Sequence, residues 1–356
     1  MSEAFPKIDV AIAAPTGAVG QRFVELLHEH PYFTISALAA SDRSAGKLYG
    51  QAVDWRLDSE IPPEVAEMEL KPLDELSQKE SPGVVFSALP SKTAGEPESE
   101  MATAGKAVFT NAADHRMDKD VPLLIAEVNP DHMSLTDRQT TSGFIVANAN
   151  CSSIMASLMF APLEKQFGIE EAHIFTQQAL SGAGNPGVPA MDIIDNVIPF
   201  IEGEADKLRS EPLKMLGTRY DPADFRIFPT VSRVNVRDGH LIVAHLSLRE
   251  TVDLELERIT EALGDFRGPE EVRALPSAPK WPIHILGQPD RPQPRLDRDT
   301  ENGMSISIGQ ISEEPKRNRI GRRVFTLIGL GHNTIRGAAG EGVLNAELAY
   351  AKGLLP

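Results

Sequence analysis

The stretch Ile8-Asp9-Val10-Ala11-Ile12-Ala13-Ala14-Pro15-Thr16-Gly17-Ala18-Val19-Gly20 decides the fold of the first half of the chain. Its first six residues are a short β-rich run, and the turn that follows leads into residues 21–30, where apolar side chains recur at helical spacing. A second β-rich run occupies residues 33–40. Strand, glycine turn, helix and strand form a βαβ unit, which binds a pyrophosphate through backbone N–H groups at the start of its helix.

The glycine turn alone leaves two interpretations open. Ala14 stands where the dinucleotide-binding pattern has its first glycine, so only Gly17 and Gly20 remain, and a turn before an ordinary helix fits equally well. Residues 41–47, Ser-Asp-Arg-Ser-Ala-Gly-Lys, follow the second strand, and their two cations and two hydroxyls favour the 2′-phosphate of NADP. Asp42 would favour NAD instead if it faced the ribose.

Further β-rich runs continue this pattern along the chain. Residues 83–90, 106–111 and 143–148 predict buried strands, and their alternation with helices predicts a parallel, doubly wound sheet. Ligands of such sheets bind at the carboxyl ends of the strands. Residues 304–310 and 323–329 alternate like strands of a mixed sheet.

We therefore predict an α/β protein of two domains, since 356 residues exceed one compact core. Residues 1–148 form a Rossmann-type NADP-binding domain. Residues 149–331 form an α+β catalytic domain with a mixed sheet.

The composition argues against several classes of protein. The net charge of −16 disfavours nucleic acid or an anionic membrane as main partner, because both repel an acidic surface. No apolar run approaches the roughly 20 residues that span a bilayer, and residues 1–7 lack the pattern of a secretory signal. We therefore expect a cytoplasmic protein. The basic run at 316–323 predicts a solvated hairpin, and no residue spacing predicts a metal site.

The chain has one cysteine, Cys151, which excludes an intramolecular disulfide and a thiolate-rich metal site. It follows the strand at 143–148, and residues 154–160 read as an apolar helix. At a helix N-terminus the dipole and free N–H groups would lower the pKa of the thiol and hold an oxyanion. This position favours a nucleophile, and a small buried side chain is the alternative interpretation.

An acylating thiolate also needs an acid or base, most often a histidine. Of the nine histidines, His240 begins a strand just after the turn that follows Arg233, so a shared site is one interpretation. An ordinary histidine at a strand edge is the other. Residues 178–187 are rich in Gly and Pro, and long irregular loops of this kind are usually functional.

Several separated motifs together resemble the aspartate-β-semialdehyde dehydrogenase family, especially its archaeal and fungal branch, over nearly the full chain. They are Gly17-Ala18-Val19-Gly20-Gln21-Arg22-Phe23, Asn150-Cys151-Ser152, Gln178 with Ser181-Gly182-Ala183-Gly184, Arg233 with His240, Asn111 with Arg116, Glu211-Pro212-Leu213-Lys214 and His332-Asn333-Thr334-Ile335-Arg336-Gly337-Ala338-Ala339-Gly340. The resemblance implies NADP(H) as cofactor. It also implies that the C-terminal segment 332–356 returns to the first domain and completes it. It further implies a homodimer or homotetramer built through the mixed sheet, so residues 149–331 are the expected dimerisation domain as well.

The resemblance implies a reaction in the biosynthesis of aspartate-derived amino acids. Cys151 attacks L-aspartyl-4-phosphate, phosphate departs, and a thioester forms at the cysteine. NADPH then reduces this thioester to L-aspartate-4-semialdehyde. His240 is the implied acid/base, and Gln178 orients the intermediate. The implied substrate residues are Arg233 for the carboxylate, Arg116 and Lys214 for the phosphate, and Asn111 and Glu211. The implied cofactor residues are Thr16, Gly17, Ala18, Val19, Ser41, Arg43, Ser44, Lys47, Leu89, Ser181, Gly182 and Asn333.

The chain departs from the family pattern in several places. Ala14-Pro15 replace the first glycine, Ala149 and Asn185 stand where Pro and Tyr are expected, and Gln310 stands where a basic residue is common. A divergent paralogue such as an NADPH-dependent malonyl-CoA reductase is therefore an alternative, although Arg233 favours an amino-acid carboxylate. A second alternative is a catalytically silent NADP-binding regulatory protein, which would be expected to lose the cysteine, glutamine or histidine.

Overall fold

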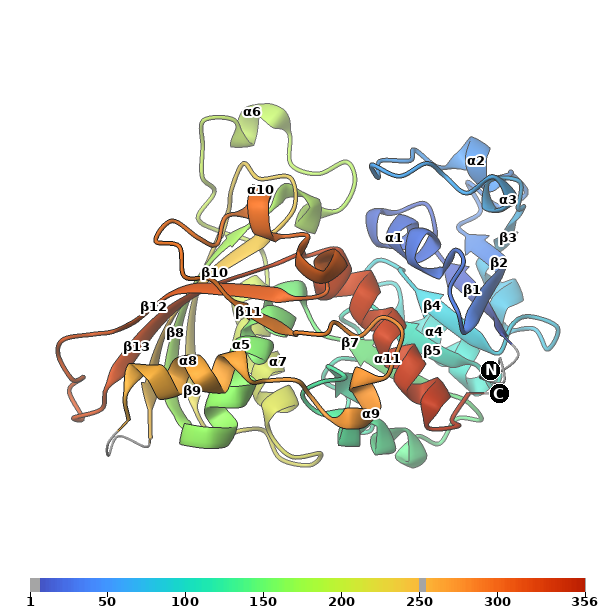
Figure 1. The fold of residues 1–356 in the computed structure, drawn as a ribbon. Helices are drawn as coiled ribbons and strands as arrows, with labels where there is room; N and C mark the ends of the chain where they lie inside the picture. Colours follow the sequence, from blue (N-terminus) through green and yellow to red (C-terminus); the bar gives the residue numbers. More distant parts are fainter. Residues whose placement is uncertain (1–6, 250–253, 356) are drawn as a thin grey trace, which may run out of the picture.

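The computed structural model describes residues 7–249 and 254–355. The expectation of no secretory signal rests largely on residues 1–6, which lie outside the described residues. The described chain builds two sheets that lie side by side (Figure 1). Within these ranges, no helix is both long and apolar enough to cross a membrane. No group of three or more His, Cys, Asp or Glu side chains there is arranged to hold a metal ion.

The first sheet is fully parallel, with strand order β3-β2-β1-β4-β5-β7-β6. This order, with β1 inside and crossovers to both sides, confirms the predicted Rossmann-type sheet. The strands are buried on both faces, which is why they read as continuous apolar runs. Their bounds are β1 Ile8–Ala13, β2 Phe33–Ala40, β3 Leu70–Pro72, β4 Val84–Ser87, β5 Ala107–Thr110, β6 Leu123–Leu124 and β7 Phe144–Asn148.

The second sheet is mixed, with strand order β11-β12-β13-β10-β8-β9. The pairs β8/β9 and β11/β12 are parallel and the other pairs are antiparallel, as the predicted mixed sheet requires. The basic run at 316–323 lies in the connection between the antiparallel strands β12 and β13. The bounds are β8 Ile169–Gln178, β9 Arg226–Arg233, β10 His240–Leu248, β11 Ile283–Ile285, β12 Ile306–Glu313 and β13 Val324–Gly331.

The helices cover the two sheets differently. Helices α1, α4 and α11 pack on the first sheet, whereas α5, α7 and α8 pack on the second (Figure 1). The α-helices are α1 Ala18–Leu27, α2 Tyr49–Ala52, α3 Pro63–Ala66, α4 Gly95–Thr103, α5 Cys151–Phe167, α6 Ala190–Ile193, α7 Glu204–Leu216, α8 Leu256–Gly264, α9 Glu270–Arg273, α10 Pro294–Asp297 and α11 Gly340–Ala351. The 3₁₀ helices are η1 Leu73–Ser77, η2 Pro130–Arg138, η3 Leu180–Ala183 and η4 Thr300–Gly303, and η5 Ile335–Ala339 is a π-helical turn.

Helix α5 joins the two sheets. It is apolar around most of its circumference, and it belongs to one cluster with Val85 of the first sheet and Ile242 of the second. Helix α11 packs in a second cluster, where Leu344 lies with Ile12 of the first sheet. The C-terminal segment therefore lies with the first sheet, and the starts of α5 and η5 meet where the two sheets adjoin.

Candidate active site

Cys151 is the first residue of α5, directly after the loop that leaves β7. Asn150 caps the helix, because its Oδ1 accepts from the backbone N–H groups of Ser152 and Ser153 at 3.0 and 3.3 Å. The Sγ atom of Cys151 lies 3.2 Å from Nε2 of His240, the first residue of β10. The fold thus brings together the two residues that the chemistry of acylation requires.

The hydrogen bonds of His240 define where its proton lies. The backbone N–H of Ala179 donates to Nδ1 at 3.0 Å, so the neutral ring carries its proton on Nε2 and presents it to the sulfur. Burial, with Arg233 and His332 nearby, lowers the pKa of His240 to about 3. The ring therefore stays neutral at physiological pH, and it is arranged to donate a proton to Sγ rather than to accept one.

The thiol of Cys151 differs from the expectation of a lowered pKa. Burial raises the pKa of Cys151 to about 12, and the Glu204 carboxylate adds to the rise, while Arg116 and Arg233 oppose it only in part. Cys151 lies in the first turn of α5, where the helix dipole acts, but the effect of burial on the pKa is larger. Without a substrate, Cys151 rests as a thiol.

Gln178, the last residue of β8, is held by a carboxylate that sequence reasoning missed. Its Nε2 donates to Glu204 Oε1 at 3.0 Å, and Asn150 Nδ2 donates to Glu204 Oε2 at 3.0 Å. Glu204 is buried at the start of α7 and connects the glutamine to the residue before the cysteine. The sequence carries a signal for it, because Glu204 and Lys207 repeat the Glu-x-x-Lys spacing found at residues 211–214.

Arg233, the last residue of β9, reaches the same space. It is buried, and its Nη1 donates to the carbonyl oxygen of Ala179 at 2.6 Å. Gly182 packs against it so closely that a Cβ would lie 2.8 Å from Arg233 Nη1 and 3.0 Å from His240 Cε1. A larger residue at this position would displace the arginine, so the loop after β8 closes directly over the arginine and the histidine.

Arg116, Asn111 and Glu211 form a second polar group beside Asn150. Arg116 donates from Nη1 to Glu211 Oε1 at 3.0 Å and from Nη2 to the Asn111 carbonyl oxygen at 2.8 Å. Glu211 Oε2 accepts from the backbone N–H of Asn150 at 2.6 Å. Arg116 Nε and Asn111 Nδ2 are buried donors without a partner in the described chain. Both are available to an anion bound near Cys151.

The two lysines of α7 have different surroundings. Lys214 Nζ donates to three backbone carbonyl oxygens at 2.7, 2.8 and 3.0 Å, those of Arg116, Asp118 and Val121. All three of its donors are therefore used, and the structure does not bring its ammonium group to Cys151 as a free cation. Lys207 lies 3.5 Å from Glu204 Oε2, is 35% exposed, and lines a cavity of about 400 Å³.

The turn before α1 keeps the shape of a phosphate cradle despite its alanine. Ala14 has a φ of 59°, which costs a residue other than glycine about 1–2 kcal/mol. Tyr49 Oη donates to the Pro15 carbonyl oxygen at 3.0 Å. Gly20 is required, because a Cβ there would lie 2.2 Å from the Ala14 carbonyl oxygen. Gly17 at the N-cap of α1 makes no side-chain hydrogen bond, so within the described residues the first N–H groups of the helix have no capping side chain and can bind a pyrophosphate.

A cavity of about 470 Å³ opens between this turn and the loop after β8. Ala18 lines it from α1, Ser181 from the loop, and Thr334 from the segment after β13. Asn333 connects the segment after β13 to the loop after β8, because its Nδ2 donates to Ser181 Oγ at 2.7 Å. Its Oδ1 accepts from the Gly239 N–H at 2.8 Å. Predicted cofactor residues from both halves of the chain thus meet at one cavity.

The other predicted cofactor residues lie at the carboxyl edge of the first sheet. Asp42 lines a different cavity, together with Asp74 and Glu100, so an acidic surface adjoins the turn after β2. Leu89 follows β4 and is half-buried. The residues in the turn after β2 are Ser41, Arg43, Ser44 and Lys47, and those at the start of α1 are Thr16, Gly17 and Val19.

Two family models match the chain. One, described as semialdehyde dehydrogenase, NAD binding domain, matches residues 9–136, and the other, semialdehyde dehydrogenase, dimerisation domain, matches residues 160–336. The aspartate-semialdehyde dehydrogenase of Archaeoglobus fulgidus is 44% identical over 350 residues, which cover 96% of this chain and 98% of the relative. That of Aspergillus fumigatus is 40% identical and covers 99% of both chains.

Solved structures agree with these matches. The crystal structure of aspartate semialdehyde dehydrogenase with NADP from Candida albicans has a TM-score of 0.88 at 36% identity, over 97% of this chain and 99% of that chain. An aspartate semialdehyde dehydrogenase II from Vibrio cholerae has a TM-score of 0.75 at 24% identity over the same shares, and shows likeness of fold alone. The archaeal and fungal relatives do not favour the malonyl-CoA reductase alternative. With relatives of this identity over almost its whole length, the chain belongs to the semialdehyde dehydrogenase family.

Proposed function

We propose that this chain catalyses the NADP-dependent reduction of L-aspartyl-4-phosphate to L-aspartate-4-semialdehyde and phosphate, in the biosynthesis of lysine, threonine and methionine. The contact of 3.2 Å between Cys151 Sγ and His240 Nε2 carries the proposal, because it pairs a nucleophile with a proton donor. The names of the archaeal and fungal relatives support the substrate, and the Candida albicans structure with NADP supports the cofactor.

The first step forms a thioester at Cys151. The sulfur attacks the acyl carbon, the bond from that carbon to the phosphate oxygen breaks, and the leaving phosphate carries away the thiol proton. Because burial raises the pKa of Cys151 to about 12, the proton leaves only as the new bond forms. The buried donors Arg116 Nε and Asn111 Nδ2 support the stabilisation of charge on the phosphate.

The second step reduces the thioester. NADPH, when bound, supplies the hydride that adds to the thioester carbonyl carbon. His240 then donates its Nε2 proton to the sulfur as the carbon–sulfur bond breaks and the aldehyde forms, and the imidazolate left behind takes a proton from water, which restores the neutral ring. Gln178 orients the acyl group, a role supported by its fixed bond to Glu204. Arg233 binds the substrate carboxylate, for which a guanidinium suits two parallel hydrogen bonds.

The proposed cofactor site lies on a domain of residues 1–148, completed by residues 332–356, and the chemistry belongs to residues 149–331. The turn at Thr16, Gly17, Ala18 and Val19 holds the pyrophosphate, and the free helix start supports this role. Leu89, Ser181, Gly182 and Asn333 would hold the nicotinamide. Ser41, Arg43, Ser44 and Lys47 would hold the 2′-phosphate.

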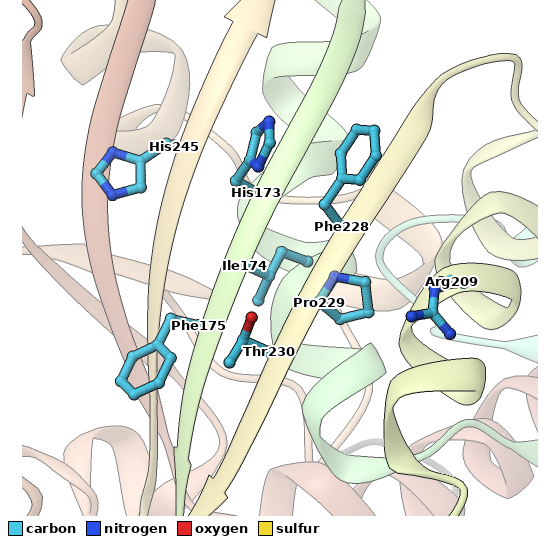
Figure 2. Close-up of a pocket in the computed structure, with 8 residues that line it drawn as sticks. All are labelled: His173, Ile174, Phe175, Arg209, Phe228, Pro229, Thr230 and His245. Atoms are coloured by element: carbon cyan, nitrogen blue, oxygen red, sulfur yellow. The ribbon is translucent and has the colours of Figure 1, made fainter. Parts of the chain in front are cut away.

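The outer face of the mixed sheet is the proposed contact between copies in a homodimer or homotetramer. Figure 2 shows Phe175 and His173 of β8 on this face with Phe228 of β9 and His245 of β10. Phe175 and Phe228 are 38% and 43% exposed, and grouped exposed aromatic side chains mark protein contacts. The description of the second family model as a dimerisation domain supports this. We expect such an oligomer to act in the cytoplasm without nucleic-acid or membrane partners.

The direct test is phosphate-dependent reduction of NADP by the purified protein in the presence of L-aspartate-β-semialdehyde, followed by the absorbance of NADPH. Turnover that requires both phosphate and the semialdehyde supports the proposal. If no turnover occurs with these substrates, the proposed reaction is wrong, and malonyl-CoA with NADPH is the next pair to measure.

The variants Lys207→Met and Lys214→Met separate the two lysines of α7. We expect Lys207→Met to raise KM for phosphate about 10- to 100-fold, since one charged hydrogen bond contributes about 1.5–3 kcal/mol. Lys214→Met should leave this KM nearly unchanged and lower the free energy of unfolding by about 2–4 kcal/mol, because three carbonyl groups lose their donor. Initial rates and thermal melts measure both effects. A raised KM for phosphate in Lys214→Met, with none in Lys207→Met, would mean that Lys214 binds the phosphate.

The variant Arg43→Ser tests the cofactor preference. If the guanidinium pairs with the 2′-phosphate, its loss should raise KM for NADPH about 10- to 100-fold and leave KM for NADH unchanged. Asp42→Asn is the matched control on the neighbouring residue, and we expect it to preserve the preference. A change in preference in Asp42→Asn, with none in Arg43→Ser, would show that the acidic residue faces the ribose.

A further inference from the structure

A fully buried ion cluster lies next to the nucleophile, and the reaction described above does not use it. Arg336 in η5 donates from Nη1 and Nη2 to the two carboxylate oxygens of Glu127 at 2.8 and 2.7 Å. Its Nη2 also lies 3.2 Å from Glu341 Oε2 at the start of α11. Arg336 and Glu341 are 0% exposed and Glu127 is 3% exposed. We call these three residues the arginine clamp.

The arginine clamp ties the connection after β6 to the adjoining elements η5 and α11, which lie about 200 residues further along the chain. Glu127 lies in the connection after β6, Arg336 in η5, and Glu341 in α11. The cluster closes on itself, because Glu341 Oε1 accepts from the backbone N–H of Ala126 at 3.1 Å. Two carboxylates face one guanidinium, and burial raises the pKa of Glu341 to about 7. Glu127 is therefore the main anionic partner of Arg336, and Glu341 adds a weaker contact.

The residue after Arg336 forms the wall against which the cysteine packs. A Cβ on Gly337 would lie 2.7 Å from the Cβ of Cys151 and 3.1 Å from its Cα, so the two backbones are in direct contact. The next carbonyl oxygen, that of Ala338, accepts from Asn148 Nδ2 at 3.0 Å. Asn148 ends the strand that leads to the cysteine. Both contacts connect η5 to the start of α5.

The form of the cluster suits positioning better than stability. Desolvation offsets most of the attraction within a buried ion pair, so such a pair adds little net stability, whereas it does favour a single geometry. A bidentate guanidinium–carboxylate pair fixes orientation as well as distance, which a lysine ammonium does not. A π-helical turn is uncommon and is often found at functional sites. Here the turn and the clamp coincide, one residue away from the contact with the nucleophile.

We propose that Arg336 is a positioning residue for Cys151, acting through Gly337. The arginine clamp holds η5 against the start of α5 and so sets the distance and orientation of Sγ relative to His240 Nε2. The inference rests on the proposed role of Cys151 as nucleophile, and it does not depend on which acyl group the enzyme accepts.

The variant Arg336→Lys keeps the charge and removes the bidentate geometry. We expect kcat to fall about 10²-fold, the effect of a misplacement of roughly 1 Å, while KM for each substrate stays nearly constant. Alkylation of Cys151 by iodoacetamide is measured without substrate, and at pH 8 it should be at least about tenfold slower than in the wild type. Its pH profile should be displaced to higher pH, because the sulfur loses the Nε2 proton of His240 as a donor. A purely structural role would not displace this profile.

The matched control is Glu347→Gln, which removes a comparably buried pair from the same helix. Glu347 Oε1 lies 2.7 Å from His30 Nε2, and both side chains are buried. Neither residue takes part in the contact between Gly337 and Cys151. This variant should lower the melting temperature and leave the alkylation profile unchanged. If Arg336→Lys does not fold, Glu127→Gln, which keeps the shape of the carboxylate, is measured in the same way.

Two outcomes would overturn the inference. One is a wild-type kcat and alkylation profile in the folded Arg336→Lys or Glu127→Gln protein. The other is loss of activity only in proportion to loss of stability, as in Glu347→Gln. Because alkylation involves no substrate, a displaced profile supports the positioning role even if the enzyme proves inactive with L-aspartate-β-semialdehyde. Failure of the proposed reaction and failure of the positioning role are therefore distinguishable.

Discussion

Replacement of Cys151 by alanine is expected to lower kcat by at least about 10⁴-fold, because no thioester forms without the sulfur and the remaining groups cannot substitute for a nucleophile. Binding of NADPH should persist, since the proposed cofactor residues lie elsewhere. Phosphate-dependent reduction of NADP and a fluorescence titration with NADPH measure the two properties. The alanine fits the helix start, because Asn150 caps it through its own side chain.

Ser157→Ala provides the control for changes within α5. Ser157 is fully buried, and its Oγ has no hydrogen-bond partner in the described chain, so removal of the hydroxyl should leave both activity and cofactor binding intact. Turnover in Cys151→Ala within about tenfold of the wild type would contradict covalent catalysis by this residue and favour direct transfer of hydride to the acyl phosphate.

The parallel sheet was predictable because its strands are buried on both faces. Residues 8–13 and 33–40 are β-rich runs whose last four residues are apolar and buried, and the strands occupy the same residues. The short strands β3 and β6, of three and two residues, carry no pattern of their own, and only pairing with their neighbours defines them. Local sequence therefore identifies the sheet and leaves its edges undetermined.

The geometry of the site depends on contacts that local sequence does not encode. Cys151 and His240 each lie at the start of a regular element, and that much was predictable from the pattern. The proton on Nε2 follows from a bond between Ala179 and the ring, which are 61 residues apart. The raised thiol pKa follows from burial and from Glu204. The Glu-x-x-Lys spacing occurs twice in α7, so spacing alone does not distinguish Lys207 from Lys214.

Replacement of His240 by asparagine is expected to lower kcat about 10²- to 10⁴-fold, the usual contribution of a positioned acid or base. The proton on Nε2, the atom that lies 3.2 Å from Sγ, is lost, so the sulfur leaves the intermediate without a donor. KM for NADP should change little. The reduction assay measures both constants, and alkylation of Cys151 reports whether the thiol itself has changed. A kcat near that of the wild type would contradict the role of His240.

His284→Asn is the matched control, because His284 lies in β11 of the same sheet and its Nε2 is 3.4 Å from Glu301, outside the site. It should retain wild-type kcat. The pH dependence adds a second test. Burial lowers the pKa of His240 to about 3, so the ring is neutral throughout the range of about pH 5–8, and kcat should show no acid limb from this residue there. An acid limb near pH 6 that disappears in His240→Asn would mean that the imidazole titrates near pH 6 in the working enzyme, and that its neutral form acts first as a base toward Cys151.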